Sequence, residues 1–504
     1  MYTRAAGAMI GAYPARRLLY GKKTQYPVHS GRRSGAWSLG CAGNREILTP
    51  NLDALAAGGV RLENCFCASP VCSPARASIL TGMMPSGHGV LDWIRSGSVD
   101  ASLAQGELAE RYVDEDKPIR YLDGLHTWPE VLAANGYTCA LCGKWHLGDS
   151  LHPAPGFSHW YTIGLGGCPY YSPDIVENGA VHLEHRYITD LITEQAVQQL
   201  EQLAAGEQPF YLSVQYTAPH SPWDAASHPQ EVRELYRDCA FESTPDLPVH
   251  PNQTTSSPVG DTPEKRREYL TGYYAAITAM DAGIGRILHA LEEAGEADNT
   301  LVVFTADNGV CMGHHGVWGK GNATFPQNMY EQSVKIPCIL RGPGVPAGVT
   351  AEGLYSHCDL YPTLLEYAGI GDAPQNPGMA GRSFAALLQG EGEDKTRDHV
   401  LIFEEYGAVR MVRGKEYKYV HRYPFGPCEL YHLPSDPDEQ HNLIDDPACT
   451  DIVTKMQRQL YEGFAAATVG CNDGLLYPVS GKGQRRKLDG SPAGTFWTDP
   501  GLRK

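Results

Sequence analysis

Two features are scarce in this 504-residue sequence: long apolar runs and positive charge. No apolar run approaches the roughly 18 residues that a membrane-spanning helix requires, so we expect no membrane span. The 41 Lys and Arg residues are outnumbered by 58 Asp and Glu residues, which gives a formal net charge of −17. Because nucleic-acid binding requires a basic surface, no nucleic-acid partner is expected. An anionic substrate would have to be attracted by a local group of cations.

The 14 cysteines show no regular spacing that would define a disulfide framework. Several of them, such as Cys139, Cys142 and Cys338, lie in apolar runs that are typical of buried strands. The pair Cys139-x-x-Cys142 could form half of a zinc or redox site, but no second pair follows at zinc spacing. The pattern therefore predicts reduced, buried thiols and a cytoplasmic location.

Acidic residues are absent from the first 45 positions, which carry eight Arg and Lys residues. An acid-free, Arg-rich beginning is compatible with a transit peptide, whereas a secretory signal would show a clean apolar core and a small-residue cleavage site. A third interpretation is that this segment is not the natural translation of the gene.

The remaining chain alternates between strand and helix patterns, which predicts an α/β sandwich around one large sheet. The segment 244–262 is rich in Pro, Ser and Thr and is expected to be a long surface loop. From His399 onward, short strands predict a smaller antiparallel subdomain. The predicted helices are 49–57, 74–80, 127–135, 189–203, 264–294 and 450–466, and the predicted strands are 137–142, 210–216, 300–305, 336–340, 400–404, 408–412 and 417–421.

The stretch Cys72-Ser73-Pro74-Ala75-Arg76, followed by Ser-Ile-Leu-Thr-Gly, is the most specific motif of the chain. Pro74 suits the first position of a helix, which places Cys72 just before a helix N-terminus that can hold an anion. A lone cysteine there would more often be a buried residue in a capping turn. The extended motif, however, resembles the signature of the type I sulfatases, in which this cysteine is oxidised to formylglycine. The resemblance covers roughly residues 39–466.

The resemblance implies a particular architecture. It implies an alkaline-phosphatase-like sandwich, with a large, mixed, mostly parallel sheet between helices and a small C-terminal antiparallel subdomain with one helix. On this basis we expect an atypical N-terminal segment (1–38), a sulfatase catalytic domain (39–395), a C-terminal subdomain (396–470) and a tail (471–504).

A metal site is also implied. Asp307 and Asn308 follow a predicted strand, where an isolated Asp-Asn-Gly would usually form a simple turn. In relatives these two residues coordinate Ca²⁺, or Mg²⁺ in some members, beside the formylglycine derived from the position of Cys72. Carboxylate and amide oxygens are the ligands that a hard cation prefers.

The remaining site residues are cations and histidines in separate motifs. Lys144 and His146 lie in Gly-Lys-Trp-His-Leu-Gly, His220 lies between two prolines, and Lys320 follows Val-Trp-Gly. Each of these residues alone would be read as a surface or turn residue. Together, in this order, they match the set with which the family binds sulfate and transfers protons. As substrate-binding candidates we add the residues Trp93 and His315.

The mechanism implied by the resemblance begins when a maturation enzyme reads Pro74 and Arg76 and converts Cys72 to formylglycine. The aldehyde hydrates, Arg76 holds the hydrate, and one metal-activated hydroxyl attacks the sulfur of a sulfate ester. Lys144 and Lys320 hold the sulfate, and His220 protonates the departing alcohol. His146 then helps to deprotonate the second hydroxyl, which expels sulfate and regenerates the aldehyde.

The chain departs from the family before residue 39. Relatives have a strand ending in Asp-Asp, whose carboxylates bind the metal, where this chain reads Arg32-Arg33. The 14 residues from Lys22 to Gly35 can be encoded so that deleting one nucleotide near the start and restoring one near the end yields KKHNIQFILADDQG. That alternative is an apolar strand with Asp-Asp at positions 32–33. We hypothesise a paired frameshift, which the nucleotide sequence can refute.

Three functions remain open at this point. The favoured one is hydrolysis of a sulfate ester, with a sulfated carbohydrate preferred over a small aryl sulfate as substrate. A phosphonate monoester or phosphodiester hydrolase would use the same modified cysteine. A catalytically silent binding protein is favoured if Arg32-Arg33 is genuine, because two guanidinium groups would repel a metal. In that case we also expect the first strand to be lost.

Overall fold

The structure is a computed structural model that describes residues 26–31, 36–255, 257–403, 409–424, 426–477 and 483–488. One mixed sheet runs through the larger part of the molecule, in the strand order β11-β2-β12-β8-β1-β7-β3-β4-β5-β6, with β13 paired to β2. Its centre, from β8 to β4, is parallel, as expected for strands that are buried on both faces. The strands are β1 (Tyr26–Gly31), β2 (Val60–Phe66), β3 (Thr138–Gly143), β4 (Phe157–Ile163), β5 (Asp174–Glu177), β6 (Ala180–Leu183), β7 (Phe210–Gln215), β8 (Val302–Ala306), β11 (Lys335–Ile336), β12 (Cys338–Arg341) and β13 (Val349–Ser356).

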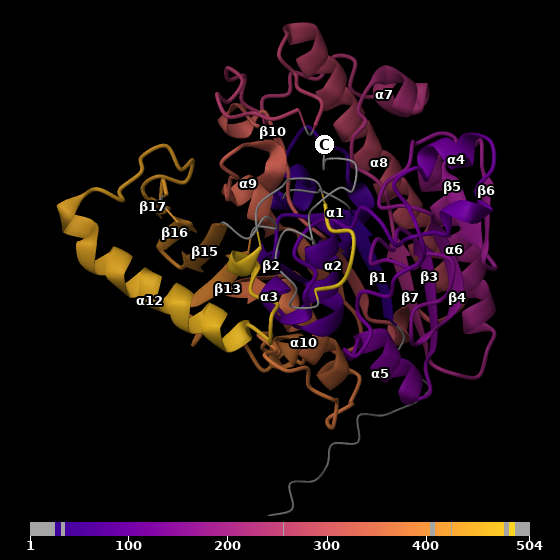
Figure 1. Ribbon diagram of the computed structural model, residues 1–504. Helices are drawn as coiled ribbons and strands as arrows, with labels where there is room; N and C mark the ends of the chain where they lie inside the picture. Colours follow the sequence, from indigo (N-terminus) through magenta and orange to yellow (C-terminus); the bar gives the residue numbers. More distant parts are fainter. Residues whose placement is uncertain are drawn as a thin grey trace, which may run out of the picture.

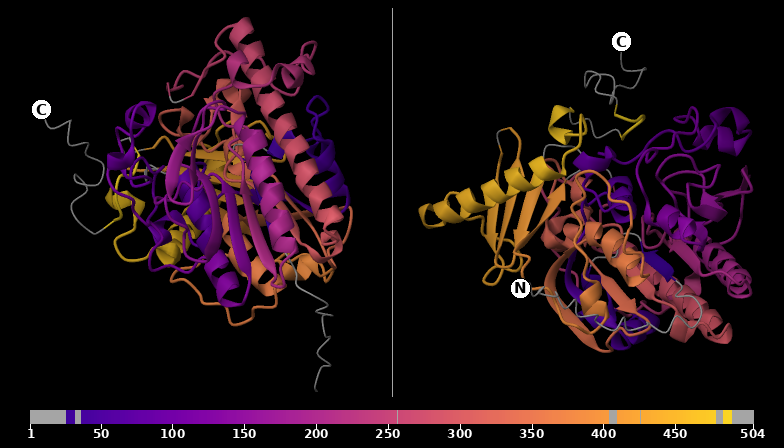
Figure 2. Two further views of the ribbon diagram at one scale, coloured as in Figure 1. Left: turned by 90° about the vertical axis from the view of Figure 1, so that its right-hand side faces the viewer. Right: turned by 90° about the horizontal axis from the view of Figure 1, so that it is seen from below.

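Helices cover both faces of this sheet (Figures 1 and 2). Two large apolar clusters fill the spaces between the helices and the sheet, one on each face. One face carries α2 (Cys72–Thr81), α5 (Trp128–Ala134) and α10 (Leu360–Tyr367), and the other carries α1 (Pro50–Ala57), α6 (Ile188–Ala204) and α8 (Pro263–Glu293).

A smaller sheet forms the C-terminal subdomain, with α12 (Thr450–Ala467) packed along it (Figure 1). Its four antiparallel strands follow chain order and are β14 (His399–Phe403), β15 (Val409–Gly414), β16 (Tyr417–Arg422) and β17 (Glu429–His432). The predicted α/β sandwich with a small antiparallel subdomain is therefore confirmed.

Most of the predicted elements are present, with ends shifted by one or two residues. Pro337 divides the predicted strand 336–340 into β11 and β12, because proline cannot donate to the ladder. The sequence analysis missed β2, β4, β5, β6, β13 and β17. It also described residues 471–504 only as a tail, although two parts of this segment contact the larger domain: Asn472 donates to the Gly87 carbonyl, and Gln484 pairs with the backbone of Trp93 and Arg95.

The expectation that the first strand is lost was wrong. β1 pairs in parallel with β7 on one side and with β8 on the other, so it occupies the centre of the sheet. The neighbouring strands present unpaired backbone groups that an extended segment satisfies whatever its side chains, which is how tertiary context overrides weak strand propensity. Gly31 lies opposite Ala306 in the register, whereas Arg32 and Arg33 lie outside the described residues.

None of the helices in the described ranges is long and apolar enough to cross a bilayer. The 14 cysteines all lie within these ranges and are free thiols, most of them buried. The Cys139-x-x-Cys142 pair lies on β3, as the interpretation as a buried strand predicts.

The sequence of β1 is unusual for its place in the sheet. Pro27 cannot donate a backbone hydrogen bond, although a strand flanks β1 on each side. We expect the replacement of residues 26–31 by Ile-Gln-Phe-Ile-Leu-Ala to raise the free energy of unfolding by at least about 2 kcal/mol, since it restores the donor and adds apolar surface between two layers of helices. Thermal melting would measure this gain.

The single change Pro27→Gln is the matched control for that replacement. It restores the donor alone and should recover only about 1 kcal/mol. An unchanged or lower melting temperature for the full replacement would show that the strand is already well suited to its position.

Candidate active site

Cys72 is the first residue of α2 and lies at the helix N-terminus, beside the carboxyl ends of the central strands. Its side chain is buried. The Lys320 amine donates to Cys72 Sγ at 3.4 Å, and the Asn308 amide lies at 4.0 Å from the same sulfur. Residues that are about 240 positions apart in the sequence thus converge on one atom, and the helix dipole and the ammonium group together make this point attractive to an anion.

Arg76 links α2 to the end of β8. Its Nε donates to the Asp307 carboxylate at 3.1 Å, and both side chains are buried. Arg76 Nη1 donates to the Lys144 carbonyl and to Gln215 Oε1, each at 3.0 Å. One guanidinium group therefore connects α2 to the carboxyl ends of β8, β3 and β7.

The side chains of Asp307 and Asn308 contact each other at the end of β8. The Asn308 amide donates to Asp307 Oδ1 at 2.8 Å, so the two side chains are held together. Within the described parts of the chain, the buried Asn308 Oδ1 has no hydrogen-bond partner, which leaves an acceptor available to a cation. These donors fit a hard divalent metal. Among the described residues there is no group of three or more His, Cys, Asp and Glu side chains that could hold a metal ion.

Lys144 contributes a buried charge. Its side chain is completely inaccessible, and its Nζ has no hydrogen-bond partner among the described residues. An ammonium group that is removed from water without a partner costs free energy, and an anionic ligand would compensate for it. The sequence analysis placed Lys144 in the sulfate-binding set, and its burial beside the Arg76 network is consistent with that prediction.

The His146 ring contacts a backbone carbonyl. Its ring Nε2 lies 2.9 Å from the Ile94 carbonyl, which can only accept, so Nε2 carries the proton and Nδ1 is the basic nitrogen of the neutral ring. Its backbone has φ 59°, and a Cβ at Gly166 would lie 2.0 Å from Nε2. A glycine is therefore required beside this ring.

His220 lies in the loop that follows β7 and is half-buried. Its Nδ1 is 2.7 Å from the Ser221 carbonyl and therefore donates to it, which makes Nε2 the basic nitrogen of the neutral ring. The Tyr170 hydroxyl donates to the His220 carbonyl at 2.8 Å and anchors this loop.

The two residues predicted to bind substrate lie in different places. Trp93 is half-buried next to Ile94 and packs against Gly483, where an added Cβ would lie 2.8 Å from the indole. The His315 ring stacks on Tyr330 at 3.7 Å and pairs with Gln332 at 3.0 Å, and burial lowers its pKa to about 4. These contacts direct His315 toward Tyr330 and Gln332, and its role as a substrate ligand stays a prediction.

Sequence reasoning missed two residues that support the site. Gln215 ends β7 and accepts from Arg76, and a polar residue at a strand end was the signal that could have identified it. His357 Nε2 donates to the Ala306 carbonyl at 2.9 Å, directly before Asp307. Burial lowers the pKa of His357 to about 4, which keeps it neutral, and no local pattern in the sequence marks it.

The segment that carries Lys320 is held by a side-chain relay. The Asn328 amide donates to the Lys320 carbonyl at 3.1 Å, and Asn328 Oδ1 accepts from the Ser333 hydroxyl at 2.8 Å. Ser333 belongs to α9 (Glu331–Val334), and its carbonyl accepts from the Gly309 amide at 3.0 Å. α9 therefore holds both the Lys320 segment and the chain that follows Asn308.

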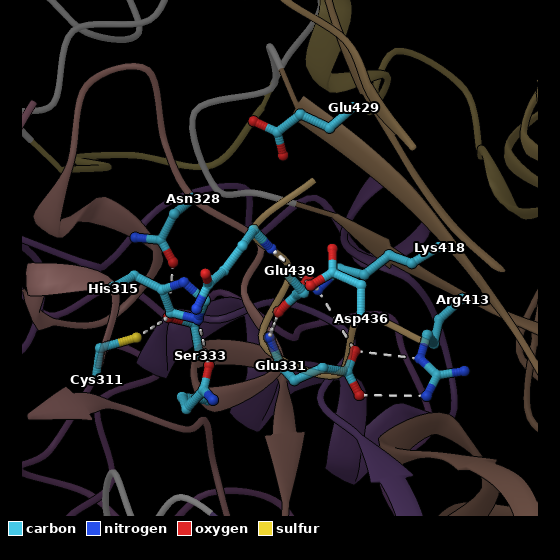
Figure 3. Close-up of polar contacts among 12 residues, drawn as sticks. Cys311, His315, Asn328, Glu331, Ser333, Arg413, Lys418, Glu429, Asp436 and Glu439 are labelled. Atoms are coloured by element: carbon cyan, nitrogen blue, oxygen red, sulfur yellow. Dashed lines mark hydrogen bonds and ion pairs between the residues drawn. The ribbon is translucent and has the colours of Figure 1, made fainter. Parts of the chain in front are cut away.

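A buried charge cluster attaches α9 to the C-terminal subdomain (Figure 3). Arg413 of β15 makes two bonds to the Glu331 carboxylate, at 3.1 and 3.3 Å. Lys418 of β16 lies 3.4 Å from Glu331 and 2.5 Å from Glu439, which in turn accepts from the Glu331 amide at 2.8 Å. Two positive and two negative groups are thus balanced in the interior.

The pKa values of the two carboxylates in this cluster are shifted in opposite directions. Burial, together with the neighbouring Glu331 charge, raises the pKa of Glu439 to about 7 despite the attraction of Lys418. Burial would also raise the pKa of Glu331, but the charges of Arg413 and Lys418 lower it to about 2. Glu331 is therefore the ionised member of the pair over the usual pH range.

The chain is similar to known proteins of one enzyme family. The profile of the sulfatase family matches residues 30–370, and that of the C-terminal part of N-sulphoglucosamine sulphohydrolase matches residues 313–465. An N-acetylglucosamine-6-O-sulfatase of Bacteroides thetaiotaomicron is 27% identical over 483 residues, covering 81% of this chain and 80% of the relative.

Two solved structures share the fold. A protein solved in complex with its substrate D-glucosamine-2-N,6-O-disulfate has a TM-score of 0.72 and 24% identity, covering 88% of this chain and 98% of that one. A phosphonate monoester hydrolase of Agrobacterium radiobacter has a TM-score of 0.64 and 21% identity, covering 88% and 96%.

The raised pKa of Glu439 predicts a pH-dependent stability. The folded protein binds this proton more tightly than the unfolded chain, in which the pKa is near 4.5, so the stabilising contribution is complete below pH 4.5 and is lost as the pH rises towards 7. The variant Glu439→Gln, which stays neutral, should therefore gain roughly 1–3 kcal/mol relative to the original chain between pH 5 and pH 8. Melting temperatures across this range would measure the change.

Glu462→Gln on α12 is the control for this comparison, because the side chain of Glu462 is largely exposed. Its melting temperature should follow that of the original chain at every pH. If Glu439→Gln also did so, Glu439 would titrate normally in the folded protein.

Proposed function

The chain belongs to the sulfatase family of sulfuric ester hydrolases, and we propose that it cleaves a sulfate ester of a carbohydrate at Cys72. The convergence of Lys320, Asn308 and the Arg76–Asp307 pair on the N-terminus of α2 is the observation that carries the proposal. Relatives that act on sulfated glucosamines favour a sugar as substrate. The likeness to a phosphonate monoester hydrolase rests on the fold alone.

The proposed nucleophile derives from Cys72, whose Sγ marks the place of the formylglycine oxygens. Formylglycine would supply an aldehyde hydrate, which combines a nucleophilic hydroxyl with a second hydroxyl for product release. Cys72 and Arg76 are buried, so a maturation enzyme that reads this motif must meet it before the chain folds. Lys320, 3.4 Å from Sγ, is placed to neutralise a nearby sulfate oxygen.

Proton transfer is assigned to the two histidines. His220 binds the Ser221 carbonyl through Nδ1 and would deliver a proton from Nε2 to the departing alcohol. His146 binds the Ile94 carbonyl through Nε2–H and would accept a proton at Nδ1 during release of sulfate. Opposite nitrogens of the two rings therefore face the ligand, and each is fixed by a backbone carbonyl.

A divalent cation, Ca²⁺ or Mg²⁺, would be held by Asp307 and by Asn308 Oδ1, and it would supply positive charge beside the nucleophile. We propose that the natural gene product completes this site with Asp-Asp at positions 32–33. Two observations support this: the end of β1 is in register with the residue before Asp307, and Pro27 is poorly suited to a central strand. Sequencing codons 20–40 from source DNA tests the hypothesis directly.

Restoring these carboxylates predicts a gain of metal-dependent activity. We expect Arg32→Asp/Arg33→Asp, made together with the β1 replacement, to raise kcat/KM for a 6-O-sulfated N-acetylglucosamine by at least about 10²-fold, since a bound Lewis acid contributes several kcal/mol. A chelator should remove the gain. Cys72→Ala should abolish turnover in either background, and a phosphonate monoester and an aryl sulfate should be poorer substrates.

Binding of the sulfated sugar without turnover in both backgrounds, after matured Cys72 has been verified by mass spectrometry, would contradict the proposed hydrolysis and favour a silent binding protein.

The buried charge of Lys144 predicts opposite effects on stability and on anion binding. We expect Lys144→Met to raise the free energy of unfolding by roughly 1–3 kcal/mol, because it removes an ammonium group that has no hydrogen-bond partner among the described residues. The variant should lose most of its turnover. Inorganic sulfate should stabilise the original chain but not the variant, and melting curves at increasing sulfate concentration would measure this difference.

The exposed Lys117→Met change is the control, and it should leave the response to sulfate intact. Equal stabilisation of the Lys144 variant by sulfate would place the anion elsewhere.

A further inference from the structure

A C-terminal strap crosses the loop beside the active site. We define the strap as residues 483–488 and the loop as residues 89–95. The Gln484 amide donates to the Trp93 carbonyl at 2.7 Å, and the Gln484 carbonyl accepts from the Arg95 amide at 2.9 Å. These two bonds form a parallel bridge between Ile94 and Gln484, 390 positions apart in the sequence.

The Gln484 side chain adds a second set of bonds to the same loop. Its Oε1 accepts from the Leu91 amide at 2.9 Å, and its Nε2 donates to the Gly89 carbonyl at 3.1 Å and, within the strap, to the Arg486 carbonyl at 3.0 Å. The residue is completely buried. A buried amide with acceptor and donors all satisfied fixes the local backbone strongly.

The opposite edge of the loop faces the active site. Because an extended backbone directs successive polar groups to opposite sides, the bonds of Trp93 and Arg95 to the strap turn the groups of Ile94 the other way. The Ile94 amide donates to the hydroxyl of Ser73, the residue after Cys72, at 3.0 Å. Its carbonyl accepts from His146 Nε2 at 2.9 Å.

Gly483 allows this close approach. A Cβ at this position would lie 2.8 Å from the Trp93 indole and 2.9 Å from Arg95 Cβ, and the backbone has φ +80°. A side chain would therefore push the strap away from the loop and would also strain the backbone.

We propose that Gln484 is a positioning residue for the reaction: through Ile94 it holds His146 in the form with Nε2 protonated and Nδ1 basic. The effect on turnover rests on the proposed function, in which His146 takes up a proton during sulfate release. The strap would act on this proton transfer without touching the substrate.

The experiment compares three full-length variants. Gln484→Met keeps the side-chain volume but loses its hydrogen bonds, and Gly483→Ala displaces the strap by a different route. Lys487→Ala is the matched control, because this exposed residue of the strap contacts only the Asp123 carbonyl in the contacts of the described chain. We expect kcat to fall about 10- to 100-fold in the first two variants with KM nearly unchanged, as for other residues that orient a catalytic group.

The pH profile and the ring signals separate positioning from general loss of structure. The acidic limb of the pH profile of kcat, which reports protonation of the proton acceptor, should shift or broaden in Gln484→Met and Gly483→Ala. In ¹⁵N-histidine-labelled protein, with the His146 signal assigned through His146→Gln, the Nε2–H form should be dominant in the original chain and mixed with the Nδ1–H form in both variants.

Unchanged His146 signals in folded Gln484→Met and Gly483→Ala would overturn the proposal, whether or not the sulfatase assay succeeds. If the expected ring signals are seen but no sulfate ester is cleaved, the proposed function is contradicted. The proposal that Gln484 positions His146 would still stand.

Discussion

The ion pair between Arg76 and Asp307 is the contact on which the active site depends. It joins the helix that begins at Cys72 to the end of β8, at 3.1 Å and with both groups buried. A buried pair is stable only when its other donors are satisfied, and Arg76 meets this requirement through the Lys144 carbonyl and Gln215. The same bonds that satisfy the guanidinium group bring the ends of the central strands together around α2.

Parts of the chain far from this pair hold the remaining site residues. The C-terminal subdomain binds α9 through the charge cluster at Glu331. In turn, α9 contacts the Lys320 segment through Asn328. The strap holds the loop that contacts His146. The first connection consists of side-chain charges and the second mainly of backbone hydrogen bonds, so pH affects them differently. Both act on groups that would move protons or bind sulfate.

The first strand shows how strongly tertiary context can determine local structure. A segment with proline and glycine becomes the central strand because β7 and β8 flank it and require backbone partners on both sides. The same register brings the end of β1 beside Ala306, next to Asp307. The end of this strand would therefore be a suitable place for metal ligands, whereas the given sequence continues with Arg32 and Arg33. The frameshift hypothesis would explain this disagreement.

The sequence alone was sufficient for the α/β fold, most helices and strands, and the nucleophile motif at Cys72, because periodicity and short motifs are local properties. It also predicted that Asp307 and Asn308 follow a buried strand at the ligand-binding edge of the sheet, and their role as metal ligands stays a prediction that rests on the family resemblance. It could not predict that Gln215, His357 and Gln484 hold site residues in place. Their hydrogen bonds join residues that are far apart in the sequence, and such bonds produce no periodic pattern in it. Only the tertiary structure decided which nitrogen of His146 is basic, since that depends on a carbonyl that folding brings to the ring.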